Sequence, residues 1–321
     1  MDKLRVGVIG CGGIANAMHL PSLTAMDDVT IVGCCDVSPE RLADRGERFG
    51  IANRYTDYRQ LLAEQQPEAV WVLLPPHHVF DVAIAVLDSG AHLLLEKPPG
   101  VTAGQTAAMA RAAEAAGRLS MVAFNRRHFP VLGACLEQVT ARGPLDQFAV
   151  TFYKHHFTGD YFRGAIDVLT CDAIHAVDLM RHLGGEPKRV ASSCRAAAGQ
   201  PTPSSWNAFI EFESGAVGQL MANWCVGKRF HYGELHARGI TCQIEFEKEG
   251  TVWADNADAP VYQTTAQELT GRTEPYINWG FAAECRYFVD CVRSGTLPNS
   301  HLGDAVKTME LAARILSGGW G

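Results

Sequence analysis

Long uninterrupted apolar runs are missing from this 321-residue sequence. No stretch approaches the roughly 18 apolar residues expected of a membrane-spanning helix. Lys3 and Arg5 precede a short apolar run, Val6–Ile9, which glycines interrupt at once. This run is shorter than the apolar region of a signal peptide. The sequence therefore predicts a cytoplasmic protein without a membrane span.

Paired cysteine spacings and basic clusters are also missing. The ten cysteines include no C-x-x-C pair, so neither a structural zinc site nor a disulfide framework is indicated. The formal net charge is −7, and no run of lysine and arginine forms the basic patch typical of nucleic-acid binding. We expect reduced and mostly buried thiols, no metal and no nucleic-acid partner.

The sequence does have the composition of a globular protein, with 47% hydrophobic and 20% charged residues, and a length that suggests two domains. In its first part, short apolar runs alternate with helical patterns, which is typical of βαβ units and a parallel sheet. Strands are expected at Leu4–Ile9, Thr30–Cys35, Ala69–Leu74, His92–Leu95 and Leu119–Phe124, and helices at Ile14–Met26, Pro39–Phe49, Val79–Ser89 and Ala103–Ala116.

After Phe124 aromatic residues become frequent, and longer strands follow one another without intervening helices. Such a succession favours a mostly antiparallel sheet. Strands are expected at Gly143–Tyr153, Trp206–Phe212, Gly215–Asn223, Ile240–Phe246 and Thr251–Ala254, and two final helices at Phe281–Arg293 and Leu302–Leu316. The sequence thus predicts an α/β protein, with a doubly wound parallel sheet of the Rossmann type in residues 1–123 and an α+β domain in residues 124–321.

The segment Gly10-Cys11-Gly12-Gly13-Ile14-Ala15 matches the dinucleotide-binding pattern G-x-G-x-x-G/A. It directly follows the first expected strand and opens a helix. Gly10 allows the tight turn, Gly12 lets a pyrophosphate approach the backbone, and Ala15 is small enough for close helix–strand packing. The free N–H groups of the helix start favour phosphates. The alternative is a glycine-rich turn that binds nothing, and the surrounding strand, helix and Asp36 argue against it.

Asp36 ends the second expected strand, where a carboxylate accepts hydrogen bonds from the adenosine ribose. The same carboxylate would repel a 2′-phosphate and therefore favours NAD over NADP. Arg41 lies one helical turn further on and acts in the opposite direction. NAD is the predicted cofactor, with NADP as the alternative.

The fourth expected strand ends in Glu96-Lys97-Pro98-Pro99. Ligands of open α/β sheets bind beyond the carboxyl ends of the strands, so Lys97 is expected where a nicotinamide would lie. Pro98 removes a backbone donor and fixes the exit of the chain.

Five motifs together carry a resemblance to a known family. They are the glycine fingerprint, Pro75-Pro76-His77-His78, Glu96-Lys97-Pro98, Phe124-Asn125-Arg126-Arg127 with Pro130, and Asp172-Ala173-Ile174-His175-Ala176-Val177-Asp178. With these motifs, and over nearly its full length, the chain resembles the glucose–fructose oxidoreductase, inositol dehydrogenase and rhizopine-catabolism (Gfo/Idh/MocA) family.

The resemblance implies an open second sheet, a sugar, cyclitol or related polyol as substrate, and a homodimer or homotetramer formed through that sheet. It also implies that Lys97 and His175 act together at the substrate hydroxyl, with Asp172 nearby. Histidine suits a general base because it titrates near neutrality, and a lysine ammonium can hydrogen-bond a developing alkoxide. The cofactor-binding residues expected from the motifs are Gly10, Gly12, Gly13, Ile14, Asp36, Arg41, Leu74, Pro75, His78, Glu96, Lys97 and Asn125.

Two features depart from the family pattern. Many relatives place the aspartate four residues before the histidine, whereas Cys171 stands there in this chain and Asp172 is three residues before His175. Residues three and four apart share a helix face, so Asp172 can still serve. Ala165-Ile166-Asp167 replaces the usual glycine-rich step. A metal held by Cys171 and His175, with His155 or His156 as a third ligand, is the less favoured alternative, because no familiar zinc spacing completes it.

On the substrate side, Asn125 and Arg127 follow the last expected Rossmann strand and are candidates to bind polyol hydroxyls or the nicotinamide carboxamide. A connecting loop without contacts is the equal alternative. His155, after the first strand of the second domain, is the preferred single substrate contact there. A core position is the general alternative for the aromatic residues around it.

Three functions fit the motifs. The leading one is a reversible alcohol–ketone dehydrogenase acting on a sugar or cyclitol. The second is an enzyme that retains NAD and uses transient oxidation to cleave a glycosidic bond. The third is a non-catalytic nicotinamide-sensing regulator on the same fold, which intact Lys97 and His175 argue against.

Overall fold

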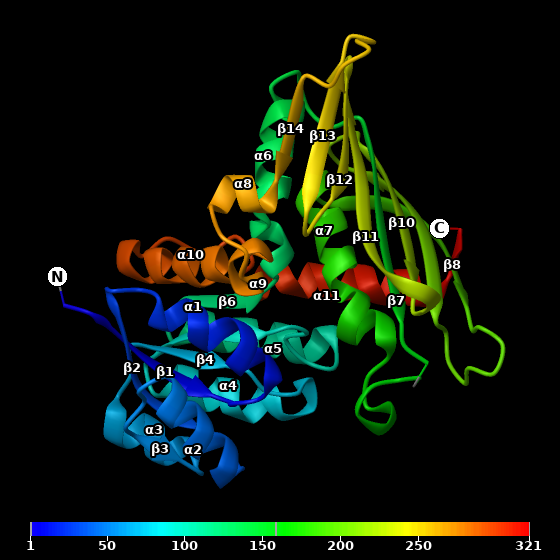
Figure 1. Cartoon of the computed structure of the whole chain (residues 1–321). Coiled ribbons are helices and arrows are strands. Elements are labelled where there is room, and N and C mark those ends of the chain that lie inside the picture. Colours follow the sequence, from blue (N-terminus) through cyan, green and yellow to red (C-terminus); the bar gives the residue numbers. More distant parts are fainter. Residues whose placement is uncertain (1, 158, 321) are drawn as a thin grey trace. The chain divides into compact units, whose positions relative to one another are not determined.

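A computed structural model describes residues 2–157 and 159–320 (Figure 1). The backbone divides into two compact units. The first comprises residues 1–124 and 275–307, and the second residues 125–274 and 308–321. The expected boundary near residue 123 lies one residue from this division. Residues 275–307, which the sequence analysis assigned to the second domain, belong instead to the first unit.

The first unit is built on a six-stranded sheet in the order β3-β2-β1-β4-β5-β6, in which every paired strand is parallel. Its strands are β1 (Leu4–Ile9), β2 (Val29–Cys35), β3 (Arg54–Tyr55), β4 (Ala69–Val72), β5 (His92–Glu96) and β6 (Ser120–Ala123). Its helices are η1 (Ala15–His19), α1 (Leu20–Thr24), α2 (Pro39–Arg48), α3 (Tyr58–Gln65), η2 (Pro76–His78), α4 (Val79–Asp88), α5 (Ala103–Ala115), α9 (Pro275–Asn278) and α10 (Phe281–Ser294). This strand order confirms the predicted Rossmann fold.

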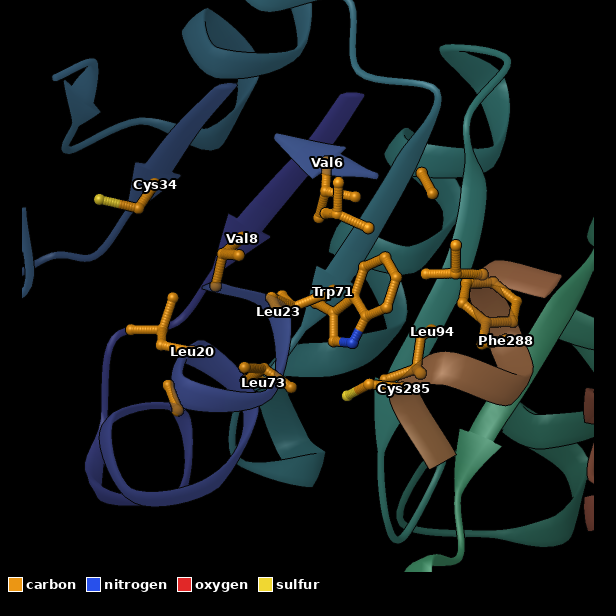
Figure 2. Close-up of a cluster of buried hydrophobic side chains, with 14 of the residues drawn as sticks. Val6, Val8, Leu20, Leu23, Cys34, Trp71, Leu73, Leu94, Cys285 and Phe288 are labelled. Carbon is orange, nitrogen blue, oxygen red and sulfur yellow. The ribbon is translucent and has the colours of Figure 1, made fainter. Parts of the chain in front are cut away.

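The first unit retains residues 275–307 because α10 completes its core. Val6 and Val8 point from β1 to one face of the sheet, where they join Trp71 of β4 in a cluster that α10 enters with Cys285 and Phe288 (Figure 2). The Phe288 ring packs edge-on against Trp71 with a centroid distance of 5.3 Å. A helix distant in sequence thus covers apolar surface that the first 124 residues would leave exposed.

The second unit contains a nine-stranded sheet in the order β14-β13-β12-β11-β7-β10-β9-β8-β15. The pairs are antiparallel except for β7 with β10. The strands are β7 (Gln147–His155), β8 (Pro187–Arg195), β9 (Ser205–Phe212), β10 (Val217–Asn223), β11 (Cys225–Ala237), β12 (Ile240–Glu245), β13 (Glu249–Ala254), β14 (Tyr262–Thr265) and β15 (Gly319–Trp320). This confirms the mostly antiparallel sheet.

The helical segments of this part of the chain are η3 (Asn125–His128), α6 (Pro130–Thr140), η4 (Phe162–Gly164), η5 (Leu169–Ala173), α7 (Ile174–Gly184), α8 (Ala266–Thr270) and α11 (Leu302–Ser317). Helix α11 begins within the first unit and ends within the second. Helix α6 contacts strands β11 to β14 of the large sheet and helix α7 contacts β7 and β10, and in Figure 1 both helices run beside the sheet.

The opposite face of the large sheet is open. Phe148, Val150 and Phe152 alternate along β7 as buried residues, while Ala149 and Thr151 point to the other face, where they line a depression of about 600 Å³. Large apolar side chains are exposed on this face, among them Phe209, Met221 and Tyr232. The sheet therefore has one covered face and one uncovered, partly apolar face.

A buried histidine lies on the covered face. His231 of β11 is enclosed by the rings of Phe129, Phe152 and Phe246, and its Nδ1 lies 3.4 Å from the carboxylate of Glu247. Burial is the main cause that lowers the pKa of His231 to about 3. The imidazole is therefore neutral in the folded protein at neutral pH.

This burial predicts a pH dependence of stability. Below its ordinary pKa of 6.5 the unfolded chain binds a proton at His231 that the folded protein excludes down to about pH 3. Stability is therefore complete above pH 6.5 and falls as the pH decreases toward 3, by at most about 1.4 kcal/mol per pH unit from this group. Urea denaturation at several pH values between 4 and 7 gives the free energy of unfolding at each pH. This free energy should change less with pH in His231→Gln than in the parent. His236→Gln, on the outer part of the same strand, is the matched control, and an unchanged slope in His231→Gln would contradict the assignment.

Candidate functional site

The glycine fingerprint forms an open turn in the first unit. Gly10 has a φ of +99°, and a side chain there would clash with the carbonyl oxygen of Leu73, so glycine is required. An added Cβ at Gly12 or Gly13 would meet no atom within 4 Å. The backbone at the start of η1 is thus bare, which is the surface a pyrophosphate needs when it binds N–H groups at a helix start. The turn fits a dinucleotide.

Asp36 closes one side of this turn. Its carboxylate, 7% exposed, accepts hydrogen bonds from the backbone N–H of Cys11 at 2.8 Å and of Ser38 at 2.9 Å. Arg41 donates to the same carboxylate from Nη1 at 3.2 Å, and its own side chain is half exposed. The side chain expected to bind ribose hydroxyls is therefore fixed beside the turn, and a cation stands next to it.

β4 pairs in parallel with β1, and β5 pairs in parallel with β4, so the carboxyl ends of both strands lie at the same edge of the sheet as the glycine turn. Leu74 contacts the turn, since an added Cβ on Gly10 would lie 3.1 Å from it. Pro75 precedes η2, which ends at His78. Glu96 ends β5, and Lys97 follows with a cis peptide bond to Pro98. The first unit thus places Leu74, Pro75, Glu96 and Lys97 at the edge where its topology favours a ligand.

In the second unit, Asp172 is surrounded by donors. Its Oδ2 accepts hydrogen bonds from Lys154 Nζ at 2.6 Å, the Tyr161 hydroxyl at 2.8 Å and Trp224 Nε1 at 3.1 Å. Burial and the adjacent carboxylate raise the pKa of Tyr161, so its hydroxyl keeps the proton. Three donors on one oxygen stabilise the charged carboxylate. Asp172 can therefore hold the side chains of its three donors in fixed orientations.

His175 stands in the first turn of α7 and is 8% exposed. The preceding segment η5, which contains Cys171 and Asp172, is a π-helix. The sequence pattern predicts α-helical spacing from Asp172 to His175, whereas the wider π turn changes the relative direction of these side chains. Cys171 is buried at 6% exposure.

Arg127 forms a buried ion pair within the second unit. Its Nε and Nη2 donate to the two carboxylate oxygens of Asp178 at 2.8 and 2.6 Å, and the Thr308 hydroxyl donates to Asp178 at 3.0 Å. Asn125 begins η3 and is buried, whereas His155 is exposed at the end of β7 and its Nδ1 contacts the carbonyl oxygen of Val226 at 2.7 Å.

Lys154 and Arg126 are two charged residues that sequence reasoning missed. Lys154 continues the inward positions of β7 after Phe152, and a charge at an inward position of an alternating strand is a usable signal. Arg126 is 5% exposed with its guanidinium 4.4 Å from the centre of the Phe152 ring. Burial lowers the pKa of Arg126 to about 10. Its signal was weak, because Arg126 and Arg127 are adjacent and identical in type.

Within the part of the chain that the structure describes, no group of three or more histidine, cysteine, aspartate or glutamate side chains is arranged to hold a metal ion. Over the same residues, no helix is both long and apolar enough to cross a membrane.

Two family models match the chain. One, described as an oxidoreductase family with an NAD-binding Rossmann fold, matches residues 4–124, and the other, the GFO/IDH/MocA C-terminal domain, matches residues 162–249. Together with the open glycine turn and Asp36, they define an NAD(P)-dependent oxidoreductase, a dehydrogenase or reductase acting on CH–OH groups. The chain belongs to the Gfo/Idh/MocA family, as its motifs predicted.

Named relatives cover most of the chain. It is 27% identical to levoglucosan dehydrogenase of Pseudarthrobacter phenanthrenivorans, over 86% of this chain and 82% of that protein. It is 24% identical to myo-inositol 2-dehydrogenase of Thermotoga maritima, over 92% and 90%. A solved levoglucosan dehydrogenase in complex with NADH and levoglucosan superposes with a TM-score of 0.84 at 23% identity, covering 98% and 97% of the two chains. The last comparison supports the fold.

The geometry around Asp36 predicts how cofactor preference will respond to mutation. Asp36→Ser removes the charge that opposes a 2′-phosphate while Arg41 remains, so the ratio of NADPH to NADH affinity should rise at least about tenfold. Arg41→Ala should lower NADPH affinity and leave NADH affinity within about threefold. Fluorescence titration with both reduced dinucleotides measures the four constants. Arg59→Ala, an exposed arginine of the same unit, is the control, and a ratio that stays constant in Asp36→Ser would refute the role of this carboxylate.

Proposed function

We propose that this protein transfers a hydride between a nicotinamide dinucleotide and a hydroxyl-bearing carbon of a sugar, cyclitol or related polyol. The observation that carries the proposal is the open glycine turn at the carboxyl edge of the first sheet, with Asp36 on one side and the Lys97 segment after β5. The names of the relatives, which act on levoglucosan and myo-inositol, support the substrate class. When bound, the nicotinamide supplies the redox chemistry.

Side chains of this protein remove the proton of the substrate hydroxyl and stabilise the charge that develops on its oxygen. We assign His175 as general base for the substrate hydroxyl, because imidazole titrates near neutrality. Lys97 is assigned to hydrogen-bond the developing alkoxide with its ammonium group. Asp172, already holding three donors, is assigned to keep Lys154 and Tyr161 in place. Asn125, Arg127 and His155 remain the proposed contacts to substrate or carboxamide.

The dinucleotide would be held by the glycine turn (Gly10, Gly12, Gly13 and Ile14), by Asp36 and Arg41, and by Leu74, Pro75, His78, Glu96, Lys97 and Asn125. The carboxylate of Asp36 favours NAD. A cytoplasmic location is also proposed, and the ten cysteines, all present as free thiols, support it.

We further propose that a second copy of this chain covers the open face of the large sheet. Exposed Phe209, Met221 and Tyr232 supply apolar surface there, next to depressions of about 600 and 380 Å³. Exposed apolar patches on a soluble protein favour association. A two-fold pairing of like faces gives the homodimer that the family resemblance implies, or one half of a homotetramer.

Substitution of the proposed catalytic pair tests the activity. Lys97→Ala and His175→Ala should each lower kcat/KM for a turned-over polyol by about 10² to 10⁴-fold, the range typical of acid–base catalysis. NADH binding by His175→Ala should stay within about threefold. A panel of sugars and cyclitols, assayed by absorbance of the reduced cofactor with NAD and NADP, provides the measurement, and Lys248→Ala and His236→Ala are the controls. Turnover that persists undiminished in Lys97→Ala refutes the assignment, and cleavage of glycosides without NADH accumulation replaces it with the glycosidic mechanism.

Charge on the open face should prevent association. Phe209→Lys combined with Met221→Lys places two like charges on each copy where the apolar surface would be buried, so the doubly substituted protein should be monomeric. Light scattering coupled to size-exclusion chromatography measures the mass. Leu297→Lys, also at an exposed apolar position, should keep the parent mass. A parent protein that is already monomeric, or a double variant with the parent mass, would exclude this interface.

A further inference from the structure

A line of hydrogen bonds runs through the core of the first unit to the backbone of Lys97. His19, at the end of the π-helical segment η1, is completely buried. Its Nε2 lies 2.9 Å from Oε1 of Glu96, and its Nδ1 lies 3.6 Å from Sγ of Cys285. Oε2 of Glu96 accepts the backbone N–H of Lys97 at 3.0 Å. The side chains of Cys285, His19 and Glu96 thus form a series of hydrogen bonds that ends at the Lys97 N–H.

The chemistry of the members sets the direction of these bonds. Burial raises the pKa of the Cys285 thiol, so the sulfur keeps its proton and can donate it to Nδ1. Nδ1 is then an acceptor, which leaves the ring proton on Nε2, directed at Glu96. The Phe281 ring packs edge-on against the imidazole, with an angle of 83° between the planes, and limits its rotation. Figure 2 shows Cys285 on α10 near Trp71, within the same apolar cluster.

The backbone after β5 gives this line its importance. Pro98 and Pro99 have no N–H group, so the Lys97 amide is the only backbone donor between Glu96 and Gly100. That donor is bound by the Glu96 side chain. The direction in which the chain leaves the sheet at Lys97 therefore depends on where the Glu96 carboxylate is held.

We propose that His19 and Cys285 are positioning residues, which hold the Glu96 carboxylate and through it orient the Lys97 backbone. Segment η1 follows the glycine turn and ends at His19. The hydrogen bond between His19 and Glu96 therefore connects the segment after the glycine turn to the end of β5. For catalysis the consequence rests on the proposed function of Lys97. The effect on the Lys97 amide does not depend on that function.

Amide hydrogen exchange tests the effect of His19 and Cys285 on the Lys97 backbone without reference to activity. Two peptides with the same first residue, one ending at Glu96 and one at Pro99, differ only by the Lys97 amide, because Pro98 and Pro99 carry none, so mass spectrometry of this pair isolates its exchange by difference. His19→Leu fills the site but has no donor, and it should speed exchange of this amide at least about tenfold. His19→Gln keeps an N–H donor near the place of Nε2 and should stay within about threefold of the parent. Cys285→Ala and Cys285→Ser form the second pair, with loosening expected only in Cys285→Ala.

Kinetics of the same variants test the consequence. With a polyol that the parent turns over, His19→Leu should lower kcat about 10 to 100-fold with NADH affinity within about threefold, and His19→Gln should restore most of kcat. Equal exchange in His19→Leu and the parent, or equal loosening in His19→Leu and His19→Gln, overturns the inference. If His19→Leu does not fold, the Cys285 pair decides in the same way. Loosening without turnover by the parent keeps the inference and rejects the proposed function.

Discussion

The parallel pairing of the first sheet is the constraint on which the site depends. Because β1, β4 and β5 run in the same direction, their carboxyl ends meet at one edge, and each end carries a different chemical element of the site. β1 leads into the glycine turn, β4 into the Leu74–Pro75 segment and β5 into Glu96 and Lys97. A parallel sheet brings these loops together whatever their separation in sequence, since the strands and not the loops determine where they lie.

In both units, candidate carboxylates that are buried or partly buried are held by several partners. Asp36 accepts two backbone N–H groups and a guanidinium, and Asp172 accepts three side-chain donors. Such carboxylates are costly to bury unless their bonds are satisfied, and once satisfied they have little freedom to move. Within each unit, polar contacts therefore fix these candidate residues as much as apolar packing does.

Much of the fold follows from periodicity. The strand–helix alternation predicted five strands of the first sheet within a few residues, and the closing helices agree with α10 and α11. The strand β3 was not predicted, because a strand of two residues has no period. The short helix α3 was not predicted either. The long strand β11 was also missed. Its pairing with β7 shifts register between Cys225 and Phe230, so Gly227, Lys228 and Arg229 interrupt the alternation that identifies strands.

The site was predictable only where motif and topology coincide. Gly10, Asp36 and Lys97 follow strands, and their places could be inferred from strand order alone. The partners of Asp172 could not, because Lys154, Tyr161 and Trp224 come from three separate segments of the second unit. Nor could the assignment of residues 275–307 to the first unit be inferred, since it depends on which apolar surface α10 covers.

Two helical segments of the described chain, η1 and η5, are π-helical, and they carry His19 and Asp172. A π turn holds one residue more than the α-helical ladder requires, so the chain can lose a residue there and still close every remaining turn. Such a loss would swing the side chains before it by about 100°, the angle of one α-helical residue. The length of these two segments can therefore change in evolution at little structural cost. A single codon gained or lost redirects a polar side chain, while the helix that follows and the sheet beneath it keep their positions.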